Sequence, residues 1–397
     1  MNKFFKKNLP IAIIAAVLLA VIILSGALLK ENFKECGYQA PIDQTENGNN
    51  THVDNEENNN SNSKENEPNN EEGSELETYK AELFIEAEWG SGEGEVGLLN
   101  LSEQGIEDAG PNYGPQSFDI NESDSHLFLL DSINERVIEY DENGKYLRDF
   151  SIGIGATTDM KIKNGYIYIL SFGSDAVYKL DMSGKILETY PITPGKNPGV
   201  GTGGIEFDEN GNVMVHINID GYYNEESRFY QIGKNGDEWK TNSYIGNIAR
   251  DKKGFYFIEG VDWLTRKVQT LDRSGSVQKE FTIKLPQKAY VYYYGSDEDN
   301  IYLNVAFEHG NMDDGYYFDE FIWKYNKNGK LIAKIDRDIF VNNLSQESRI
   351  EILSNPETNG AYTREFRKIR ITDIENIYLM LPFKEKGIQI FKYSKTE

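Results

Sequence analysis

The chain has few of the residue types that many enzymes and nucleic-acid-binding proteins need. It holds one cysteine, Cys36, in 397 residues, so neither an internal disulfide framework nor a cysteine-built zinc site can form. Its 41 Lys and Arg are outnumbered by 65 Asp and Glu, which gives a formal charge of −24. Because phosphate binding requires clustered Lys and Arg, nucleic acid is not an expected partner.

Residues that carry catalysis are also scarce. The chain has four histidines, no Gly-x-Ser-x-Gly elbow and no glycine-rich phosphate loop with lysine. His126 begins a predicted strand, whereas His216 ends one and His309 lies in a predicted loop, so three histidines are not expected to converge on a metal. His216 and His309 joined by Asp or Glu remain an alternative metal site, and a packed core role for His216 is the default. We therefore predict no catalytic residues.

The N-terminal region has the pattern of a membrane anchor. Residues 1–8 form a basic tip, predicted to be cytoplasmic, and residues 9–30 are predicted to be a transmembrane signal anchor. Ile11 to Leu29 contain no charged residue and as a helix would nearly cross a hydrocarbon core of about 30 Å. A signal peptide cleaved after Ser25-Gly26-Ala27 is the alternative. We expect a single-pass protein of the cell membrane with its C-terminal domain outside.

Residues 31–78 are predicted to be a disordered acidic linker. Between Asn47 and Asn70, 11 of 24 residues are Asn, and residues 37–78 hold eleven acidic residues against one lysine. Almost none of these side chains can be buried, so nothing offsets the entropy lost on ordering. Repulsion between like charges extends such a segment, which makes it a tether between membrane and domain.

Residues 79–397 contain a repeat with a period near 45 residues. Each unit has short runs rich in Ile, Val, Tyr and Phe, joined by turns in which Gly follows Asn or Ser, as tight hairpins require. The turns are at residues 140–145, 180–185, 232–237, 271–276 and 325–330. The strand-like run that comes before the turn in each unit recurs at residues 126–131, 166–171, 212–217, 255–260, 301–306 and 377–382.

Four strands per unit at this period predict an all-β fold, a six-bladed β-propeller. In the first unit the strands are expected at residues 116–120, 126–131, 136–140 and 146–150. The last unit has no fourth strand because the chain stops, so Ala81–Glu88 is predicted to supply it and to close the ring. An open stacked solenoid is the alternative architecture.

One unit resembles an NHL repeat. Residues 114–150, GPQSFDINESDSHLFLLDSINERVIEYDENGKYLRDF, have the Pro, the strand ending in Asp, the Asn-x-Arg-Val and the Tyr-Asp-x-x-Gly-Lys of that pattern. The preceding WGSGEGE at residues 89–95 is similar to the usual glycine-rich lead-in. The second repeat matches moderately, and the others match in strand and turn rhythm only. The resemblance implies a six-bladed propeller, a fold that serves binding and sensor domains as well as a few lyases.

The candidate site is predicted on the face of the propeller where the connections between strands are longest. In a propeller, one face carries the connections from the second to the third strand and from the fourth strand to the next unit. The expected expansions lie on this face, at residues 191–204, 217–228, 259–267, 306–321 and 336–366. Within the last of them, residues 345–353 could form a short helix. Loops on a rigid scaffold commonly carry function. The predicted contacts on this face are Tyr222, Tyr223, Trp263, Tyr316 and Tyr317.

Acidic residues gather in the same links. They are Asp220, Glu225, Glu226, Asp313, Asp314 and Asp319. Their spacing is not that of an EF-hand loop, so a solvated rim is expected, no cofactor is predicted, and calcium is the alternative.

Together these features predict a membrane-anchored extracytoplasmic binding or sensor propeller that recognises a protein, peptide or glycan. Two alternatives stay open. One is a lyase or hydrolase with a metal or carboxylate site at the top of the central channel, and the other is a structural subunit of an envelope assembly.

Overall fold

The computed structural model describes the all-β part of the chain. The described residues are 76–99, 113–171, 173–192, 204–208, 210–218, 227–231, 238–241, 254–311, 315–337, 369–372, 376–383 and 386–396. The predicted anchor at 9–30 lies outside them, and almost all of the predicted linker does as well. No helix in the described ranges is long and apolar enough to cross a bilayer.

The described strands form six antiparallel sheets. The first two contain β2 (Ser117–Asn121), β3 (His126–Asp131), β4 (Arg136–Tyr140) and β5 (Tyr146–Ser151), then β6 (Thr157–Lys163), β7 (Tyr166–Ser171), β8 (Ala176–Asp181) and β9 (Ile186–Pro191). The third contains β10 (Gly204–Phe207), β11 (Val213–Asn218), β12 (Ser227–Gln231) and β13 (Glu238–Thr241). The fourth contains β14 (Gly254–Gly260), β15 (Thr265–Asp272) and β16 (Val277–Lys284). The fifth contains β17 (Ala289–Ser296), β18 (Asn300–Asn311), β19 (Gly315–Asn326) and β20 (Leu331–Asp336).

The sixth sheet joins the two ends of the domain. Its order is β21 (Ile369–Ile371), β22 (Ile377–Phe383), β23 (Gly387–Lys395) and then β1 (Tyr79–Ala87). β1 pairs antiparallel with β23, from Tyr79 opposite Lys395 to Ala87 opposite Ile388. The predicted pairing of the first segment with the last is therefore confirmed, and the four strands predicted for the first repeat are confirmed to within one residue at each end.

The hairpin turns follow from the repeated Asx-x-x-Gly sequence. In the first sheet, Asp141 accepts the backbone N–H groups of Asn143 and Lys145 through its carboxylate, and Gly144 has a φ of 79°. A Cβ at Gly144 would also collide with the backbone oxygen of Phe84 in β1. Glycine is therefore needed here both for the positive φ and for the close approach of β1.

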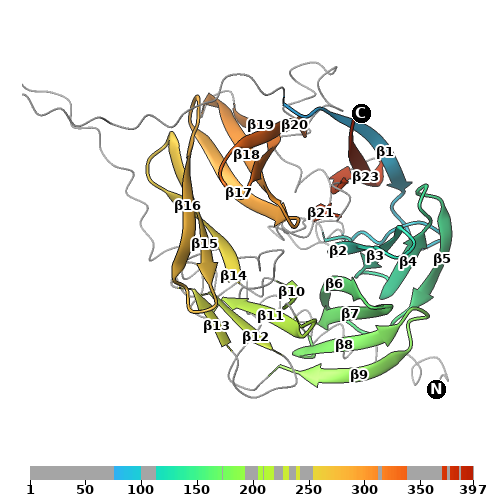
Figure 1. The fold of residues 1–397 in the computed structure, drawn as a ribbon. Coiled ribbons are helices and arrows are strands. Elements are labelled where there is room, and N and C mark those ends of the chain that lie inside the picture. Colours follow the sequence, from blue (N-terminus) through green and yellow to red (C-terminus); the bar gives the residue numbers. More distant parts are fainter. Residues whose placement is uncertain are drawn as a thin grey trace, which may run out of the picture. The chain divides into compact units, whose positions relative to one another are not determined.

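Buried side chains pack each sheet against its neighbour. Hydrophobic clusters join the sheets in the order third, second, first, sixth, fifth and fourth. The first strand of each sheet contacts the first strand of the next in the same order, which is β10, β6, β2, β21, β17 and β14. Figure 1 shows the sheets of residues 76–396 following one another around a centre, with these strands innermost. This arrangement is that of a β-propeller.

One predicted loop expansion is wrong, and a second is an extended hairpin rather than a loop. Residues 259–267 contain a link of only four residues, because β14 ends at Gly260 and β15 begins at Thr265, and the first sheet has a link of the same length between β3 and β4. Residues 306–321 are mostly strand, since β18 and β19 continue as a hairpin to Asn311 and from Gly315. In both cases the β-pairing extends into residues whose polarity suggested a loop. The predicted helix at 345–353 lies outside the described residues.

Candidate functional site

The structure describes one predicted contact residue in full. Trp263 is in the link between β14 and β15, and Tyr316 and Tyr317 are in β19 rather than in a loop. Tyr222 and Tyr223 lie outside the described residues.

The link that carries Trp263 is held in one conformation by its own polar groups. The Asp262 carboxylate accepts the N–H of Leu264 at 2.7 Å, and the N–H of Val261 donates to the carbonyl of Thr265 at 3.2 Å. The guanidinium of Arg266, a buried residue, donates to the carbonyls of Asp262 and Thr265 and, at 2.7 Å, to that of Ala289. The backbone is therefore satisfied internally, and the apolar side chains point outward.

Three apolar side chains of this link are exposed. Val261 is 56%, Trp263 60% and Leu264 48% exposed. The Nζ atom of Lys288 lies 4.4 Å from the centre of the Trp263 ring, in the range of a cation–π contact. A rigid turn that exposes a tryptophan costs little ordering entropy when a partner covers it.

The hairpin of β18 and β19 projects beyond its sheet. β17 pairs with β18 only up to Phe307, and β20 pairs with β19 only from Phe321, while β18 and β19 pair with each other to Asn311 and Gly315. At about 3.3 Å per residue, four to six residues project by roughly 13–20 Å. Two sequence-predicted residues, Tyr316 and Tyr317, are in this projecting part.

Lys288 connects the link to the hairpin. Besides its contact with Trp263, its Nζ lies 3.2 Å from a carboxylate oxygen of Glu308 in β18. Next to Glu308, Nε2 of His309 lies 2.9 Å from Asp319 of β19. Because side chains alternate along a strand, His309 and Asp319 are on the opposite face of the hairpin from Glu308. We call the set Val261, Trp263, Leu264, Lys288 and Glu308 the Trp263–hairpin surface. It combines exposed apolar groups with charges of both signs, which suits recognition more than chemistry.

A second polar group of residues joins the inner strands. Arg370 of β21 donates through Nε to Asp119 of β2 at 3.0 Å and through Nη2 to the hydroxyl of Ser117 at 2.9 Å. Asp119 also accepts the backbone N–H of Ile162 in β6 at 2.7 Å.

The same pattern is repeated one sheet further on. Asp159 of β6 accepts the Ser117 hydroxyl at 2.6 Å and the backbone N–H of Ile205 in β10 at 2.8 Å. This inner-strand network, made of Ser117, Asp119, Asp159 and Arg370, ties four sheets together by buried charge-assisted hydrogen bonds.

Sequence reasoning missed the inner-strand network, although a signal was present. The first strand of successive repeats carries an acidic residue, Asp119, Asp159 and then Glu206. Burial raises the pKa of the Glu206 carboxyl, Lys161 opposes the shift, and Asp159 adds to it. A carboxyl with a raised pKa beside other charges is the kind of group that binds ligands or moves protons.

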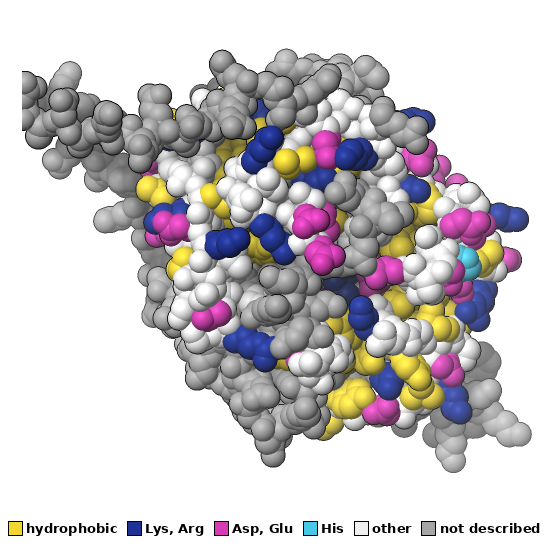
Figure 2. Space-filling model, viewed as in Figure 1, with side chains coloured by type: hydrophobic (Ala, Val, Ile, Leu, Met, Phe, Trp, Pro, Cys, Tyr) yellow, Lys and Arg dark blue, Asp and Glu magenta, His cyan; other side chains and the backbone are white. Residues whose placement is uncertain are grey.

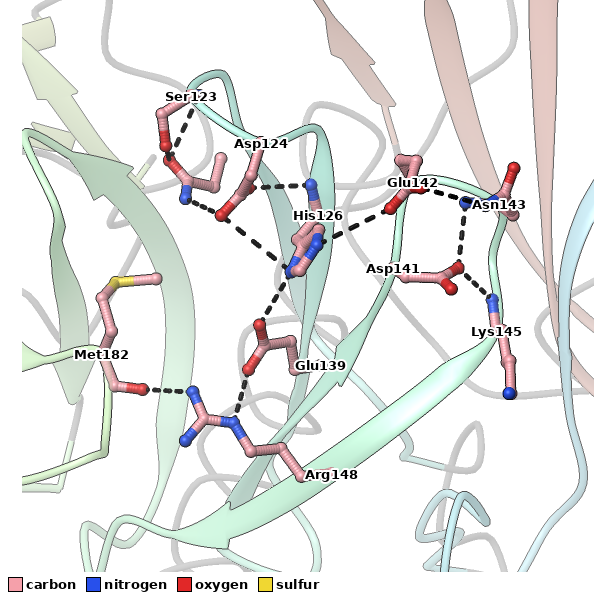
Figure 3. A network of polar contacts seen from close by, with 11 residues as sticks. Ser123, Asp124, His126, Glu139, Asp141, Glu142, Asn143, Lys145, Arg148 and Met182 are labelled. Carbon is pink, nitrogen blue, oxygen red and sulfur yellow. Dashed lines mark hydrogen bonds and ion pairs between the residues drawn. The ribbon is translucent and has the colours of Figure 1, made fainter.

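The turns at the opposite edge of the sheets hold a third polar cluster, drawn in Figure 3. His126 donates from Nδ1 to the carboxylate of Glu139 at 2.9 Å, and its Nε2 lies 3.7 Å from Glu142. Glu139 also accepts from Arg148 at 2.6 Å, and Arg148 donates at 2.8 Å to the carbonyl of Met182, in the second sheet. The predicted position of His126, away from the candidate face, agrees with its contact to the turn residue Glu142.

No group of three or more His, Cys, Asp and Glu with metal-binding geometry is found among the residues for which the structure gives positions. His309 lies in strand β18, not in a loop, and faces Asp319. His216 is in β11. Charged side chains of both signs are interspersed on the face shown in Figure 2.

No family model and no curated protein matches this sequence. Among solved structures, a streptogramin B lyase is 11% identical with a TM-score of 0.40, covering 80% of this chain and 98% of the other. A gluconolactonase from Xanthomonas campestris is 11% identical with a TM-score of 0.40, over 81% and 96% of the two chains. A DUF4221 family member from Bacteroides vulgatus is 7% identical with a TM-score of 0.46, over 81% and 100%. Because these scores are low, the propeller assignment depends on the strand pairing and sheet packing described above.

Proposed function

We propose that this chain is a membrane-anchored, extracytoplasmic, six-bladed propeller of the NHL type. In this proposal residues 9–30 span the membrane once, residues 31–78 are the tether, and the domain outside binds a protein, peptide or glycan. The six sheets and the β1–β23 pairing support the blade count. The apolar run Ile11–Leu29 supports the anchor.

The observation that supports the binding role is the exposure of Trp263 on its turn. A side chain of this size is seldom left 60% exposed on a rigid turn beside two other exposed apolar residues. Tryptophan is also the residue type most enriched among those that dominate binding energies. Lys288 and Glu308 supply a polar rim next to it.

The test is capture by the full-length chain in its membrane. Cells that display the wild type, Trp263→Ala or Leu147→Ala are cross-linked, and the captured envelope proteins and glycans are identified with and without calcium. Leu147 is a matched control because it is 44% exposed on β5, in another sheet. Removing the tryptophan should weaken capture about 30-fold, as expected for a loss of about 2 kcal/mol. Equal capture by the wild type and Trp263→Ala would show that the site lies elsewhere.

One observation favours the enzymatic alternative enough to test it. Glu206, with its raised pKa, lies beside Asp159 on the inner strands, where a carboxylate site of a lyase or hydrolase would be placed. Turnover of lactone or glycan substrates by the wild type that is lost in Glu206→Gln would favour this alternative over a binding module.

A further inference from the structure

The link that carries Trp263 offers a partner mainly apolar atoms. Its carboxylate and neighbouring backbone groups already bond within the protein, because Asp262 accepts the N–H of Leu264 through the carboxylate and a bond from Arg266 through the carbonyl. The N–H of Val261 donates to a carbonyl across the link. A surface that covers these side chains must therefore be apolar where it touches them, since its polar groups would lose water without gaining hydrogen bonds.

The surroundings of the Trp263 ring favour a protein over a glycan. The Nζ atom of Lys288 lies over the ring, 4.4 Å from its centre, and Glu308 holds the same ammonium at 3.2 Å. Stacking of a sugar needs an open aromatic face whose negative charge attracts the C–H groups of the sugar, but the ammonium blocks one face and weakens this attraction at the other. A glycan would also bring hydroxyl groups, for which the apolar side chains of Val261 and Leu264 provide no partner.

The form of the link distinguishes a folded protein from a peptide. Residues 261–264 are the connection at the end of the hairpin of β14 and β15, and their apolar side chains are exposed. Domains that bind peptides receive them in a groove or along a free strand edge, whereas a projecting apolar side chain fits into a pocket of its partner. The matching partner is a folded protein with an apolar pocket.

Lys284 adds a positive charge beside the link. It is exposed and lies opposite Thr265, the first residue after the link. Lys267 lies 3.6 Å from Glu259 and Lys288 is paired as described above, whereas Lys284 forms no ion pair with any residue that the structure describes. In a chain with a formal charge of −24, this local positive charge favours a partner with an acidic group beside its pocket.

The link and the entry of the chain into the domain are at opposite ends of the fifth sheet. At the entry, Glu77 accepts from Nζ of Lys324 at 2.8 Å and donates its N–H to the carbonyl of Ile332 at 2.9 Å. Lys324 pairs with Tyr302 of β18, and Glu308, which contacts Lys288 beside the link, is six residues further along the same strand. At about 3.3 Å per residue this is roughly 20 Å. The predicted anchor precedes Glu77 in the sequence, so this placement favours a protein that approaches from the far end over the lipid around the anchor.

We propose that the Trp263–hairpin surface binds a folded protein whose apolar pocket receives Trp263 and whose pocket rim presents an acidic group to Lys284. This inference rests on the proposed binding function and narrows its partner from a protein, peptide or glycan to a folded protein.

The experiment repeats the capture by the full-length chain in its membrane, with pretreated envelope fragments as probes. One sample is digested with protease, one is heated to unfold its proteins, and one is oxidised with periodate, which cleaves sugar units that have neighbouring hydroxyl groups. Vesicles of extracted membrane lipid are a further probe. The readout is the difference in capture between the wild type and Trp263→Ala. This difference should disappear after protease and after heating, remain after periodate, and be absent with the lipid vesicles.

Each other outcome overturns the proposal in a recognisable way. A difference that survives protease but not periodate would indicate a glycan, one that survives heating would indicate a peptide, and one seen with the vesicles would indicate lipid. Equal capture of untreated fragments by the wild type and Trp263→Ala would contradict the proposed function as well, so the two failures are distinguishable.

A charge-reversal variant tests the rim. Lys284→Glu should weaken capture about tenfold at low salt and much less at high salt, because charges at the rim of an interface act over a distance that salt shortens. Lys185→Glu is the matched control, since Lys185 is an exposed lysine in a turn of the second sheet and its replacement changes the net charge equally. Equal weakening by the two variants, or none by Lys284→Glu, would refute the acidic rim.

Discussion

His126 should make the stability of this domain depend on pH near neutrality. Its imidazole faces three carboxylates: Glu139 at 2.9 Å, Glu142 at 3.7 Å and Asp124 at 4.0 Å. The hydrogen bond to Glu139 raises the pKa of His126 above its ordinary value of 6.5, burial opposes this, and the charges of Asp124 and Glu139 add to it. Arg148, on the other side of Glu139, is the only cation in the cluster of Figure 3 that bonds to this carboxylate besides His126.

The direction of the His126 pKa shift determines whether the domain gains or loses stability as the pH rises. Because the folded pKa is above that of the unfolded chain, the protonated imidazole stabilises the fold fully below pH 6.5, and this contribution is lost as the pH rises through the folded pKa. A hydrogen bond to a charged group is worth roughly 1.5–3 kcal/mol, and partial exposure reduces this to about 1 kcal/mol. For a domain of this size that corresponds to about 2 °C in Tm.

The perturbation is His126→Gln, which keeps a donor for Glu139 but cannot be protonated. Denaturant unfolding is measured from about pH 5 to pH 9 for the wild type, for His126→Gln and for His52→Gln, whose histidine is in the predicted linker. The wild type and His52→Gln should lose about 1 kcal/mol more than His126→Gln across this range. Identical pH profiles of wild type and His126→Gln, or an imidazole pKa of 6.5 or below by NMR, would refute this reasoning.

Three further predictions concern stability. Arg370→Met should lower the free energy of unfolding by about 3–5 kcal/mol in denaturant titrations, because it leaves the inner-strand carboxylates without their cation; a loss below about 1 kcal/mol would contradict the network's role. Gly144→Ala should unfold at a lower temperature than Gly165→Ala, since both have positive φ but only Gly144 meets a backbone oxygen of β1; equal losses of about 1–2 kcal/mol would contradict this. Burial opposes the shift, but hydrogen bonds from Lys324 and Lys395 lower the pKa of Glu77, so the wild type should lose more stability than Glu77→Gln as the pH falls below 4.5 in acid titrations; equal losses would contradict this.

The β-hairpins could be predicted from the sequence because each one is specified by residues in or next to its own turn. Asx-x-x-Gly turns such as Asp141–Gly144 carry their own hydrogen bonds and their positive φ, so each hairpin is specified within a few residues. The pairing of β1 with β23 was also predictable, because a repeat that lacks its last strand leaves an open edge and an extra apolar strand precedes the first repeat.

The shape of the links was less predictable. Residues 259–267 were predicted to be an enlarged loop, yet Asp262 and Arg266 bond to the backbone and close a short turn. Likewise, residues 306–311 continue as strand because they pair with β19 beyond the limits of their own sheet. Tertiary pairing overrode the local signal in both places.

The sequence by itself determined the repeat, its turns, the strand that closes the ring and the acidic character of the chain, because each depends on residues near one another or on composition. Only the tertiary structure decided which side chains meet. Arg370 reaches Asp119 from a distant part of the sequence, and Asp159 reaches the backbone N–H of Ile205, because neighbouring sheets pack with their first strands innermost. The depth of that packing sets which of these charged groups form hydrogen bonds, and the spacing of the repeats along the sequence does not specify it.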